Sequence, residues 1–430
     1  MSMPDEVPAV LVQPSAVEDP RIGASAQRKA GLRLLPVIAV GYGLAFMDRI
    51  NISFASLRMN QDLHFSATIY GIGAGIFFLG YAVCEVPSNL MMLRFGARRW
   101  LTRIMFTWGL LATSMMFVRT PFQFYAVRLL LGVSEAGFFP GVIYYLTLWF
   151  PANMRARAVS RFYISGAISS VAVGMLAGWL LGLNGKMGLS GWQWLFLVEG
   201  LPPVFFSLVI WKMLPDGPDK AGWLTTEEKA WLRHRLSAEN AQAHFGHEAG
   251  VLQALLSPKV WLIGLFFFCV LTCFYGYSFS APAILQEATG WNVNSVGFLT
   301  AAMGMVGALA MLAGGASSDR TGDRALHCII PACIMAICFV LASFSHPGWL
   351  VVGCLSCMFM AFEAAQAPAL AVPTQLLAGR ACAAGIAAIN TITMFSGFVG
   401  PYWMGVMKDA TGSYWLGLRG LAIPALAAAG

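Results

Sequence analysis

Four charged residues stand inside long apolar segments of the sequence, where charges are rare. Asp48 and Arg49 are neighbours in the first apolar segment, and Arg128 and Glu135 lie in the fourth. On insertion scales, a charged side chain near the centre of a bilayer costs about 2.5–3.5 kcal/mol. We therefore expect these four side chains to face one another or water rather than lipid.

Helical spacing predicts that the four charges share a cavity. Arg128 and Glu135 are seven residues apart, which is about two turns of an α-helix, so they project from nearly the same face. At about 1.5 Å per residue, Asp48 and Arg128 fall at similar depths in their segments, and Glu135 lies closer to the middle of the membrane. The spacing indicates a polar site between helices.

The types of these side chains suit the binding of an anion together with protons. A guanidinium holds a carboxylate through two parallel hydrogen bonds and keeps its charge at physiological pH. Burial favours the neutral form of a carboxyl group and a nearby arginine favours its charged form, so such a group can load and release a proton. We expect Asp48 and Glu135 to couple to protons, and Arg49 and Arg128 to bind the substrate. The alternative is a set of permanent salt bridges that fix the helices.

Other polar side chains fall at mid-depth by the same arithmetic. Tyr81 and Asn390 are the expected further substrate contacts, with plain helix packing as the alternative. Gln366 lies at a similar depth. Glu363 is a further acid in the middle of a segment, and Glu199 lies in the outer third of another; the sequence assigns a role to neither.

Two loops half a chain apart resemble each other and indicate an internal repeat. Arg94–Arg99 reads RFGARR after the second segment, and Asp319–Arg324 reads DRTGDR after the eighth. This internal repeat predicts two similar six-helix bundles with the substrate near the midplane between them. We expect Glu85, near the inner end of the second segment, to be a structural or gating partner of the loop arginines. The predicted gating or structural set is Glu85, Arg94, Arg98, Asp319 and Arg320.

The composition is that of a membrane protein. Of the 430 residues, 58% are hydrophobic and 11% charged, whereas soluble proteins have roughly 45–50% apolar and about 25% charged residues. Apolar runs of about 20 residues are long enough to cross a hydrocarbon core roughly 30 Å thick. Because lipid satisfies no backbone polar group, these runs should be helices, and the expected fold class is an all-α membrane protein.

Polar breaks divide the chain into four parts. These are a cytoplasmic tail (1–33), a first six-helix bundle (34–214), a cytoplasmic central loop (215–257) and a second six-helix bundle (258–430). The expected spans are 34–57, 66–93, 100–118, 122–149, 158–183, 192–213, 259–285, 294–317, 325–344, 349–377, 381–407 and 413–430. The last span is short, so we expect a truncated final helix.

The central loop carries one helix signal. Thr225 followed by Glu228 is a capping-box pattern, which predicts a short amphipathic helix up to Leu236 on the cytoplasmic surface. The alternative is a solvated linker helix without a binding role.

The basic residues indicate how the chain is oriented. The net charge is +7, and 20 of the 27 Lys and Arg residues lie in the tail and in alternate loops. By the positive-inside rule, both termini are expected in the cytoplasm, which places the protein in the cell's inner (plasma) membrane. This distribution explains the positive charge without a nucleic-acid partner. No cleavable signal peptide is expected before Val37.

The sequence contains no arrangement expected of an enzyme. The nine cysteines, including Cys354 and Cys357, lie in apolar spans without neighbouring histidines, so we expect small buried residues rather than a metal site. The six histidines are scattered, and neither a nucleophile with its base nor a cofactor loop is apparent. We expect no catalytic residue, no metal and no cofactor. Most aromatic side chains are expected to face lipid or to pack between helices.

Several motifs together resemble those of the anion:cation symporter family of the major facilitator superfamily. They are Asp48-Arg49-Ile50-Asn51, Gly71–Phe78, Gly80-Tyr81, Glu85–Asn89, Arg128–Gly141 (RLLLGVSEAGFFPG), Trp192-Gln193-Trp194, Glu199–Pro202 and Gly397–Pro401. The resemblance covers about residues 30 to 410. It implies a twelve-helix, two-bundle fold that works by alternating access. Bacterial members of the family import sugar acids, tartrate, phthalate or aromatic acids.

The resemblance also implies roles for individual residues. The acids that match Asp48 and Glu135 are linked to proton coupling in the family, and the arginines that match Arg49 and Arg128 are linked to the anion. Tyr81 matches a cavity position, as does Asn390. Phe46 departs from the pattern, because relatives often have a tyrosine there.

The sequence as a whole predicts a secondary transporter that imports a small organic carboxylate with protons. Its expected partners are that anion, protons and the lipid bilayer, and a monomer is expected. The alternatives are a membrane solute sensor that does not transport and an anion uniporter or exchanger of the same fold. The fifth span lacks the Gly-Pro pattern of drug:proton antiporters, which disfavours efflux. The sequence does not identify the anion.

Overall fold

The structure is a computed structural model that describes residues 19–243, 257–345, 347–376 and 381–430. In these ranges every regular element is a helix. Parts of the predicted tail (1–18) and of the predicted central loop (244–256) lie outside the described residues.

The helices follow the predicted spans. The first half contains α2 (Pro20–Asp62), α3 (Ala67–Phe95), α4 (Ala97–Ser114), α5 (Pro121–Glu135), α6 (Phe138–Thr147), α7 (Ala152–Leu181) and α8 (Gly191–Met213). The second half contains α11 (Pro258–Thr289), α12 (Val293–Thr321), α13 (Leu326–Phe344), α14 (Gly348–Leu376), α15 (Ala381–Met394), α16 (Ser396–Thr411) and α17 (Trp415–Ala429). Each of the twelve expected spans coincides with one of these helices or with two consecutive ones, so the predicted all-α membrane fold is confirmed.

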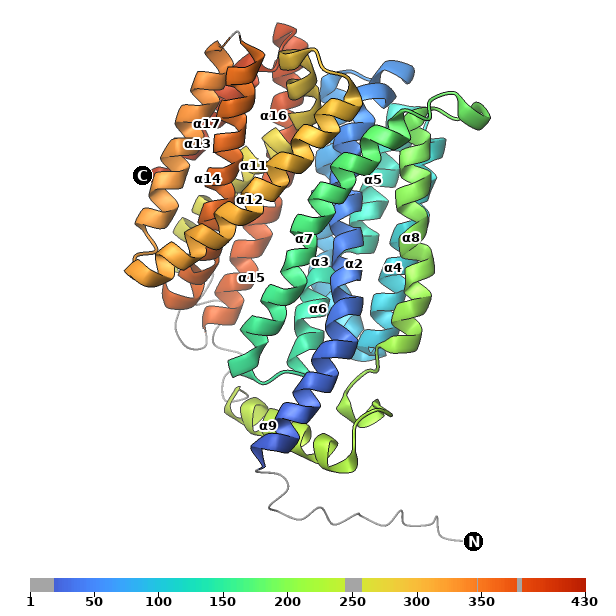
Figure 1. The fold of residues 1–430 in the computed structure, drawn as a ribbon, viewed down its shortest axis with the longest axis vertical. Coiled ribbons are helices and arrows are strands. Elements are labelled where there is room, and N and C mark those ends of the chain that lie inside the picture. The colour runs from blue at the N-terminus through green and yellow to red at the C-terminus, as the bar shows by residue number, and fades with distance from the viewer. Residues whose placement is uncertain (1–18, 244–256, 346, 377–380) are drawn as a thin grey trace.

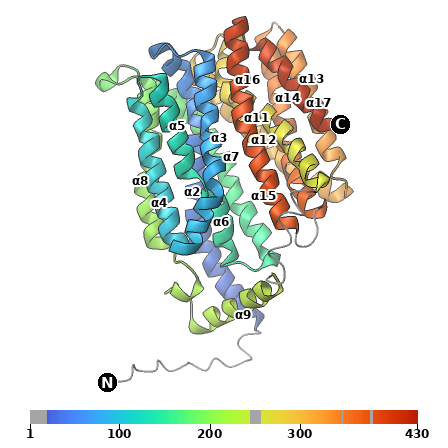
Figure 2. The ribbon, with the colours of Figure 1, turned by 180° about the vertical axis from the view of Figure 1, so that it is seen from behind.

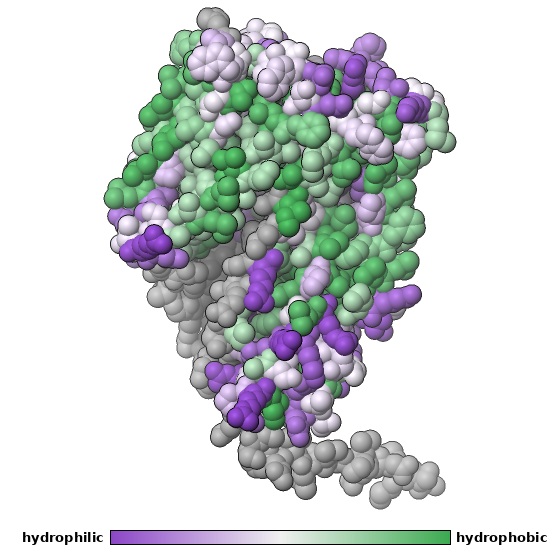
Figure 3. All heavy atoms as spheres, viewed as in Figure 1, coloured by the Kyte–Doolittle hydropathy of each residue, from purple (hydrophilic) through white to green (hydrophobic). Residues whose placement is uncertain are grey.

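The two halves of the chain form two groups of helices that stand side by side. Figures 1 and 2 show α2–α8 on one side and α11–α17 on the other, with α7 and α12 meeting between them. Figure 3 shows apolar side chains across the middle of the visible face and hydrophilic side chains toward the end that carries α9. In the described part of the chain, eight helical segments are long and apolar enough to cross a membrane.

The central loop forms a helix that packs on the first half. The helix α9 (Thr226–Ala243) begins with the predicted capping box, in which the Glu228 side chain accepts from the Thr225 amide at 2.9 Å and the Thr225 hydroxyl accepts from the Glu228 amide at 3.2 Å. Glu228 also accepts from Ser25 at 2.7 Å and from Lys29 at 3.0 Å, both on α2. The fully buried Leu232 adds an apolar contact. The helix is therefore docked rather than free in solvent.

The charge of Glu228 is stabilised by this docking. Burial raises the pKa of Glu228, but the hydrogen bonds from Lys29 and Ser25 outweigh burial and hold that pKa below its ordinary value. The carboxylate thus stays ionised at neutral pH and joins α9 to the first turns of α2, which contain Ser25 and Lys29.

At the opposite end, the two halves touch closely. We call the end with α9 the basic end and the opposite end the far end. Near the far end, a Cβ on Gly71 of α3 would lie 2.5 Å from the carbonyl oxygen of Pro401 on α16, and a Cβ on Gly297 of α12 would lie 2.2 Å from the carbonyl oxygen of Gly174 on α7. Glycine is required for these helices to approach so closely.

Hydrogen bonds between the halves complete this contact, which we call the far-end seal. Asp409 of α16 accepts from the first two backbone amides of α3, at 3.0 Å from Ala67 and at 2.8 Å from Thr68. Those amides lack partners within their own helix, and the carboxylate suits the positive end of the helix dipole. The Tyr70 hydroxyl donates to the Phe279 carbonyl of α11 at 2.8 Å. The far end is therefore closed in this structure.

The substitution Gly71→Ala should weaken the far-end seal. Its methyl group needs about 3.5 Å from Pro401, so α3 and α16 must separate by about 1 Å or more. We expect spin labels at Gln61 and Thr411, in a background without the nine cysteines, to show a broader and longer distance distribution. The control is Gly353→Ala, because a Cβ there meets no atom within 4 Å. Identical distributions in the two variants contradict the assignment of Gly71 to the seal.

Candidate functional site

A cavity of about 390 Å³ lies between the two halves. Its walls come from α2, α3, α5, α6 and α7 on one side and from α11, α12, α14 and α15 on the other. Cavities that bind small molecules have volumes of about 300–1,000 Å³. The far-end seal lies beyond this cavity, so the cavity is shut off from the far end.

Arg49 and Glu135 form an ion pair in the wall of the cavity. An Nη2 hydrogen of Arg49 is donated to Oε1 of Glu135. The Arg49 side chain is 24% exposed and the Glu135 side chain 1%, and both line the cavity. Among the described residues, Nε of Arg49 and Oε2 of Glu135 have no hydrogen-bond partner. The pair therefore has unused bonding capacity on both members.

Aromatic rings hold the arginine in place. The Arg49 guanidinium carbon lies 5.5 Å from the ring centre of Phe77 and 5.6 Å from that of Tyr81. The negative faces of aromatic rings attract a cation without neutralising it. Arg49 thus keeps its charge available to a partner in the cavity.

The helix breaks directly after Glu135. Glu135 is the last residue of α5, Ala136 is extended with ψ 132°, and Gly137 has φ 85° before α6 begins at Phe138. The stretch expected as a single span at 122–149 is thus divided into α5 and α6. The sequence signal was present, because Gly137 is followed by Pro140 and these two residue types mark interruptions.

Asp48 does not face the cavity. Its carboxylate accepts hydrogen bonds from the Trp108 indole at 2.9 Å and from the Asn51 amide at 3.4 Å, and the residue is only 2% exposed. Successive residues of a helix point about 100° apart, and Asp48, unlike its neighbour Arg49, is not among the described residues that line the cavity. The structure places Asp48 behind the cavity wall, toward α4.

Arg128 also lies behind the wall. It is 1% exposed, donates to the backbone carbonyl oxygens of Gly73 at 3.1 Å and Ala74 at 3.2 Å, and stacks 4.8 Å from the Phe77 ring centre. Arg128 is not among the described residues that line the cavity. Its seven-residue separation from Glu135 places it about 10 Å closer to the far end, at the level of the seal.

Tyr81, Glu85 and Asn390 all line the cavity. The Asn390 side-chain amide of α15 donates to Oε1 of Glu85 on α3 at 2.8 Å, which joins the two halves across the cavity. The sequence placed Glu85 with the loop arginines. In the described part of the chain, the hydrogen bond of its side chain is instead made to Asn390.

The remaining predicted residues lie at the basic end, within their own halves. The Arg98 amide donates to Asp216 at 3.0 Å, and its side chain donates to the carbonyl oxygen of Trp211. Asp319 pairs with Arg324 at 2.6 Å. Arg94 and Arg320 are exposed. The contacts of Arg98 and Asp319 thus stabilise loops at the basic end and are not part of the cavity wall.

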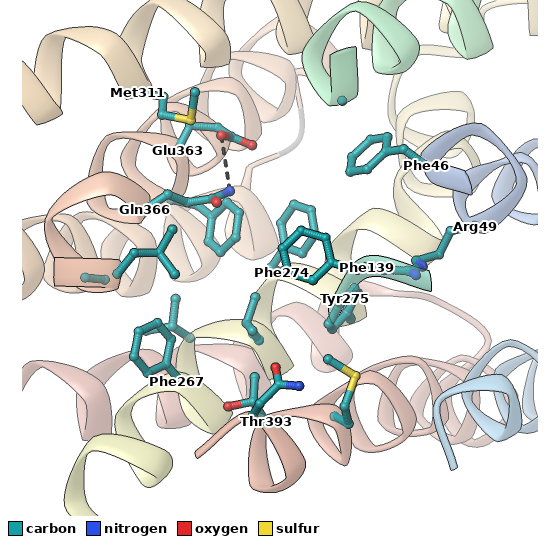
Figure 4. Close-up of a pocket in the computed structure, with 18 of the residues that line it drawn as sticks. Phe46, Arg49, Phe139, Phe267, Phe274, Tyr275, Met311, Glu363, Gln366 and Thr393 are labelled. Carbon is teal, nitrogen blue, oxygen red and sulfur yellow. Dashed lines mark hydrogen bonds between the residues drawn. The ribbon is translucent and has the colours of Figure 1, made fainter. Parts of the chain in front are cut away.

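The second half contributes an acid to the cavity. Glu363 of α14 lines it and accepts from the Gln366 side-chain amide at 3.2 Å, as the dashed line in Figure 4 shows. Several aromatic rings line the space as well, although most aromatic side chains were expected to face lipid or to pack between helices: Phe46, Phe139, Phe266, Phe267, Phe274, Phe359 and Phe362. Glu199 is buried and is not among the described lining residues.

Among the described residues, no group of three or more His, Cys, Asp or Glu side chains is placed to hold a metal ion. Cys354 is buried, whereas Cys357, which was expected to be buried, is exposed.

The chain is similar to known transporters along most of its length. The sequence model described as Major Facilitator Superfamily matches residues 38–401. A protein of Agrobacterium vitis named "Putative tartrate transporter" is 42% identical over 392 residues, which cover 91% of this chain and 87% of that protein. A "Quinolone resistance transporter" of Acinetobacter baumannii is 37% identical over 396 residues, which cover 92% and 91%.

A solved structure shares the fold at low sequence identity. It is the inward-facing, unoccupied form of a bacterial homolog of the human lysosomal transporter Spinster, with a TM-score of 0.77 and 16% identity. The alignment covers 96% of this chain and 95% of that one.

The substitution Gly137→Ala should destabilise the protein through the break beside Glu135. An alanine at φ 85° is strained by roughly 1–2 kcal/mol, and its Cβ would lie 2.4 Å from the Ser88 hydroxyl. Gly185→Ala is the matched control, because Gly185 has φ 83° and no atom within 4 Å of its Cβ position. We expect a clearly lower Tm in detergent for Gly137→Ala than for Gly185→Ala. Equal Tm values contradict the tight packing of the break.

Proposed function

Since the chain belongs to the Major Facilitator Superfamily, and is therefore a multi-pass membrane transporter rather than an enzyme, we propose that it imports a small organic carboxylate together with protons. The observation that carries this proposal is the ion pair of Arg49 and Glu135 in the wall of the cavity. One site then contains Arg49, a cation that can bind the anion, and Glu135, an acid that can carry the proton.

Arg49 is the proposed anion-binding group. A substrate carboxylate can take the place of Glu135 on the guanidinium through two parallel hydrogen bonds, and Nε of Arg49 is free among the described residues to make one of them. The hydroxyl of Tyr81 and the amide of Asn390 line the same space. They are proposed to orient the substrate by further hydrogen bonds.

Glu135 is the proposed proton carrier. When the substrate occupies Arg49, the displaced carboxylate would be buried without a cation, which is strongly unfavourable. Uptake of a proton by Glu135 removes that charge. Binding of the anion and binding of the proton are therefore favoured together, as a symporter requires.

Asp48 and Arg128 are proposed to act from behind the wall. Arg128 adds positive charge close to Phe77 and fixes the backbone of α3 through its two carbonyl contacts. Asp48 is a second buried acid without a salt bridge among the described residues. We assign it a part in proton coupling through its electrostatic effect on the cavity, and not through contact with the substrate.

Alternating access is proposed to involve the far-end seal. The basic end is taken as cytoplasmic, because loops that carry Lys and Arg remain on that side, and the far end then faces outward. The protein is placed in a bacterial inner membrane as a monomer with both termini in the cytoplasm. Opening of the seal, with closure around Glu85 and Asn390, would expose the cavity to the outside.

Export is a second candidate. One relative at 37% identity is named for quinolone resistance, so the direction of net transport has to be measured. A uniporter or an exchanger is a third possibility within the same fold, and a sensor that does not transport is a fourth.

Uptake into proteoliposomes separates these functions. For a monoanion carried with one proton, a gradient of one pH unit can drive about tenfold accumulation. We expect labelled carboxylates to accumulate when the outside is acidic, and Glu135→Gln to lose this accumulation while it still exchanges labelled for unlabelled substrate. The exposed Glu227 of α9 supplies the control Glu227→Gln.

Each other outcome points to a different function. Undiminished proton-driven accumulation in Glu135→Gln removes that residue from the coupling role. If the wild type exchanges labelled for unlabelled substrate and the pH gradient has no effect, the protein is an exchanger. If the carboxylate accumulates when the inside of the proteoliposomes is acidic, the protein is an exporter driven by protons. Absence of any transport by correctly folded wild-type protein contradicts the proposal.

A further inference from the structure

The cavity has a carboxyl group at the end opposite Arg49. Figure 4 shows Glu363 and Gln366 on one side, with Met311 beside them, and Arg49 on the other. Glu363 comes from α14 in the second half of the chain and Arg49 from α2 in the first. A substrate that spans the cavity therefore meets a cation at one end and a carboxyl group at the other.

Among the residues that the structure describes, no cationic side chain pairs with Glu363. Among the described residues, its side chain accepts a hydrogen bond from Gln366 and takes part in no ion pair. It also lines a second, smaller cavity of about 80 Å³ near Phe46 and Tyr277, so space adjoins it on two sides. A carboxyl group in such surroundings is strongly favoured by a cation that comes within hydrogen-bonding distance.

The space between the two ends is lined by rings. Phe139, Phe274 and Tyr275 lie between Glu363 and Arg49 in Figure 4. Phe274 stacks on Phe362 with ring centres 4.1 Å apart and planes 12° from parallel. An aromatic substrate can join such a stack. Substrate hydroxyl groups that lie against these rings would lose hydrogen bonds to water.

We propose that the substrate is a zwitterionic aromatic carboxylate, whose carboxylate binds Arg49, whose ring lies among the phenylalanines, and whose ammonium group binds Glu363 and Gln366. This inference rests on the proposed carboxylate transport and narrows the class of carboxylate. It selects against tartrate-like hydroxy acids, which carry hydroxyl groups in place of a ring. Glu363 is the residue that determines specificity at the end of the cavity opposite Arg49.

Two nearly isosteric probes test the subsite. Para-aminomethylbenzoate carries a carboxylate and an ammonium group, and para-ethylbenzoate has a methyl group in place of the ammonium. Binding to the purified full-length protein in detergent is measured by calorimetry, and uptake is measured in proteoliposomes. Because hydrogen bonds to charged groups are stronger than those between neutral groups, we expect the wild type to bind the amine probe about tenfold tighter or more.

The variant Glu363→Gln should abolish that preference. We expect the affinities for the two probes to become equal within about twofold, with para-ethylbenzoate bound as in the wild type. Glu227→Gln is the control and should keep the wild-type ratio. If Glu363→Gln does not fold, as judged by size-exclusion chromatography, Gln366→Leu replaces it and should reduce the preference severalfold, because it removes the amide that orients the carboxyl group.

The results distinguish this inference from the function on which it depends. If para-ethylbenzoate or tartrate is bound and transported but the amine gives no advantage, the subsite is refuted and carboxylate transport stands. Tighter binding of tartrate than of either aromatic probe also refutes it. If no carboxylate is bound or transported by folded protein, both proposals fail.

Discussion

The ion pair of Arg49 and Glu135 places two opposite charges in a wall that is otherwise largely apolar. Removal of one partner from a buried pair typically costs 3–5 kcal/mol, because the other charge is left without compensation. A ligand that takes Arg49 from Glu135 must therefore be an anion, and Glu135 must gain a proton. In the proposed mechanism, this constraint links binding of the anion to uptake of the proton within one site.

The rest of the first half keeps this pair in position. The helix breaks directly after Glu135, at Ala136 and Gly137, and the positive φ of Gly137 makes this break possible. Arg128 fixes the α3 backbone at Gly73 and Ala74, next to the Phe77 ring that both arginines face. The glycines of the far-end seal bring the two halves close enough to enclose the site.

Some of this arrangement follows from the sequence, and some does not. Composition and polar breaks predict the spans, because the bilayer fixes the length of each helix. The presence of Arg49 and Glu135 in apolar segments predicts a pair. Which neighbour faces the cavity, Asp48 or Arg49, depends on how α2 is rotated against its neighbours. The contact of Glu85 with Asn390 joins residues 305 positions apart, and only the packed bundles bring them together.

The central claim is that the anion displaces Glu135 from Arg49 and that Glu135 then takes up a proton. The most direct test measures proton uptake with a pH indicator while benzoate binds to purified protein in weakly buffered detergent. By linkage, the wild type should take up about one proton per benzoate bound near neutral pH, and Glu135→Gln should bind benzoate without proton uptake. Equal proton uptake by both proteins, or none by the wild type, contradicts the account.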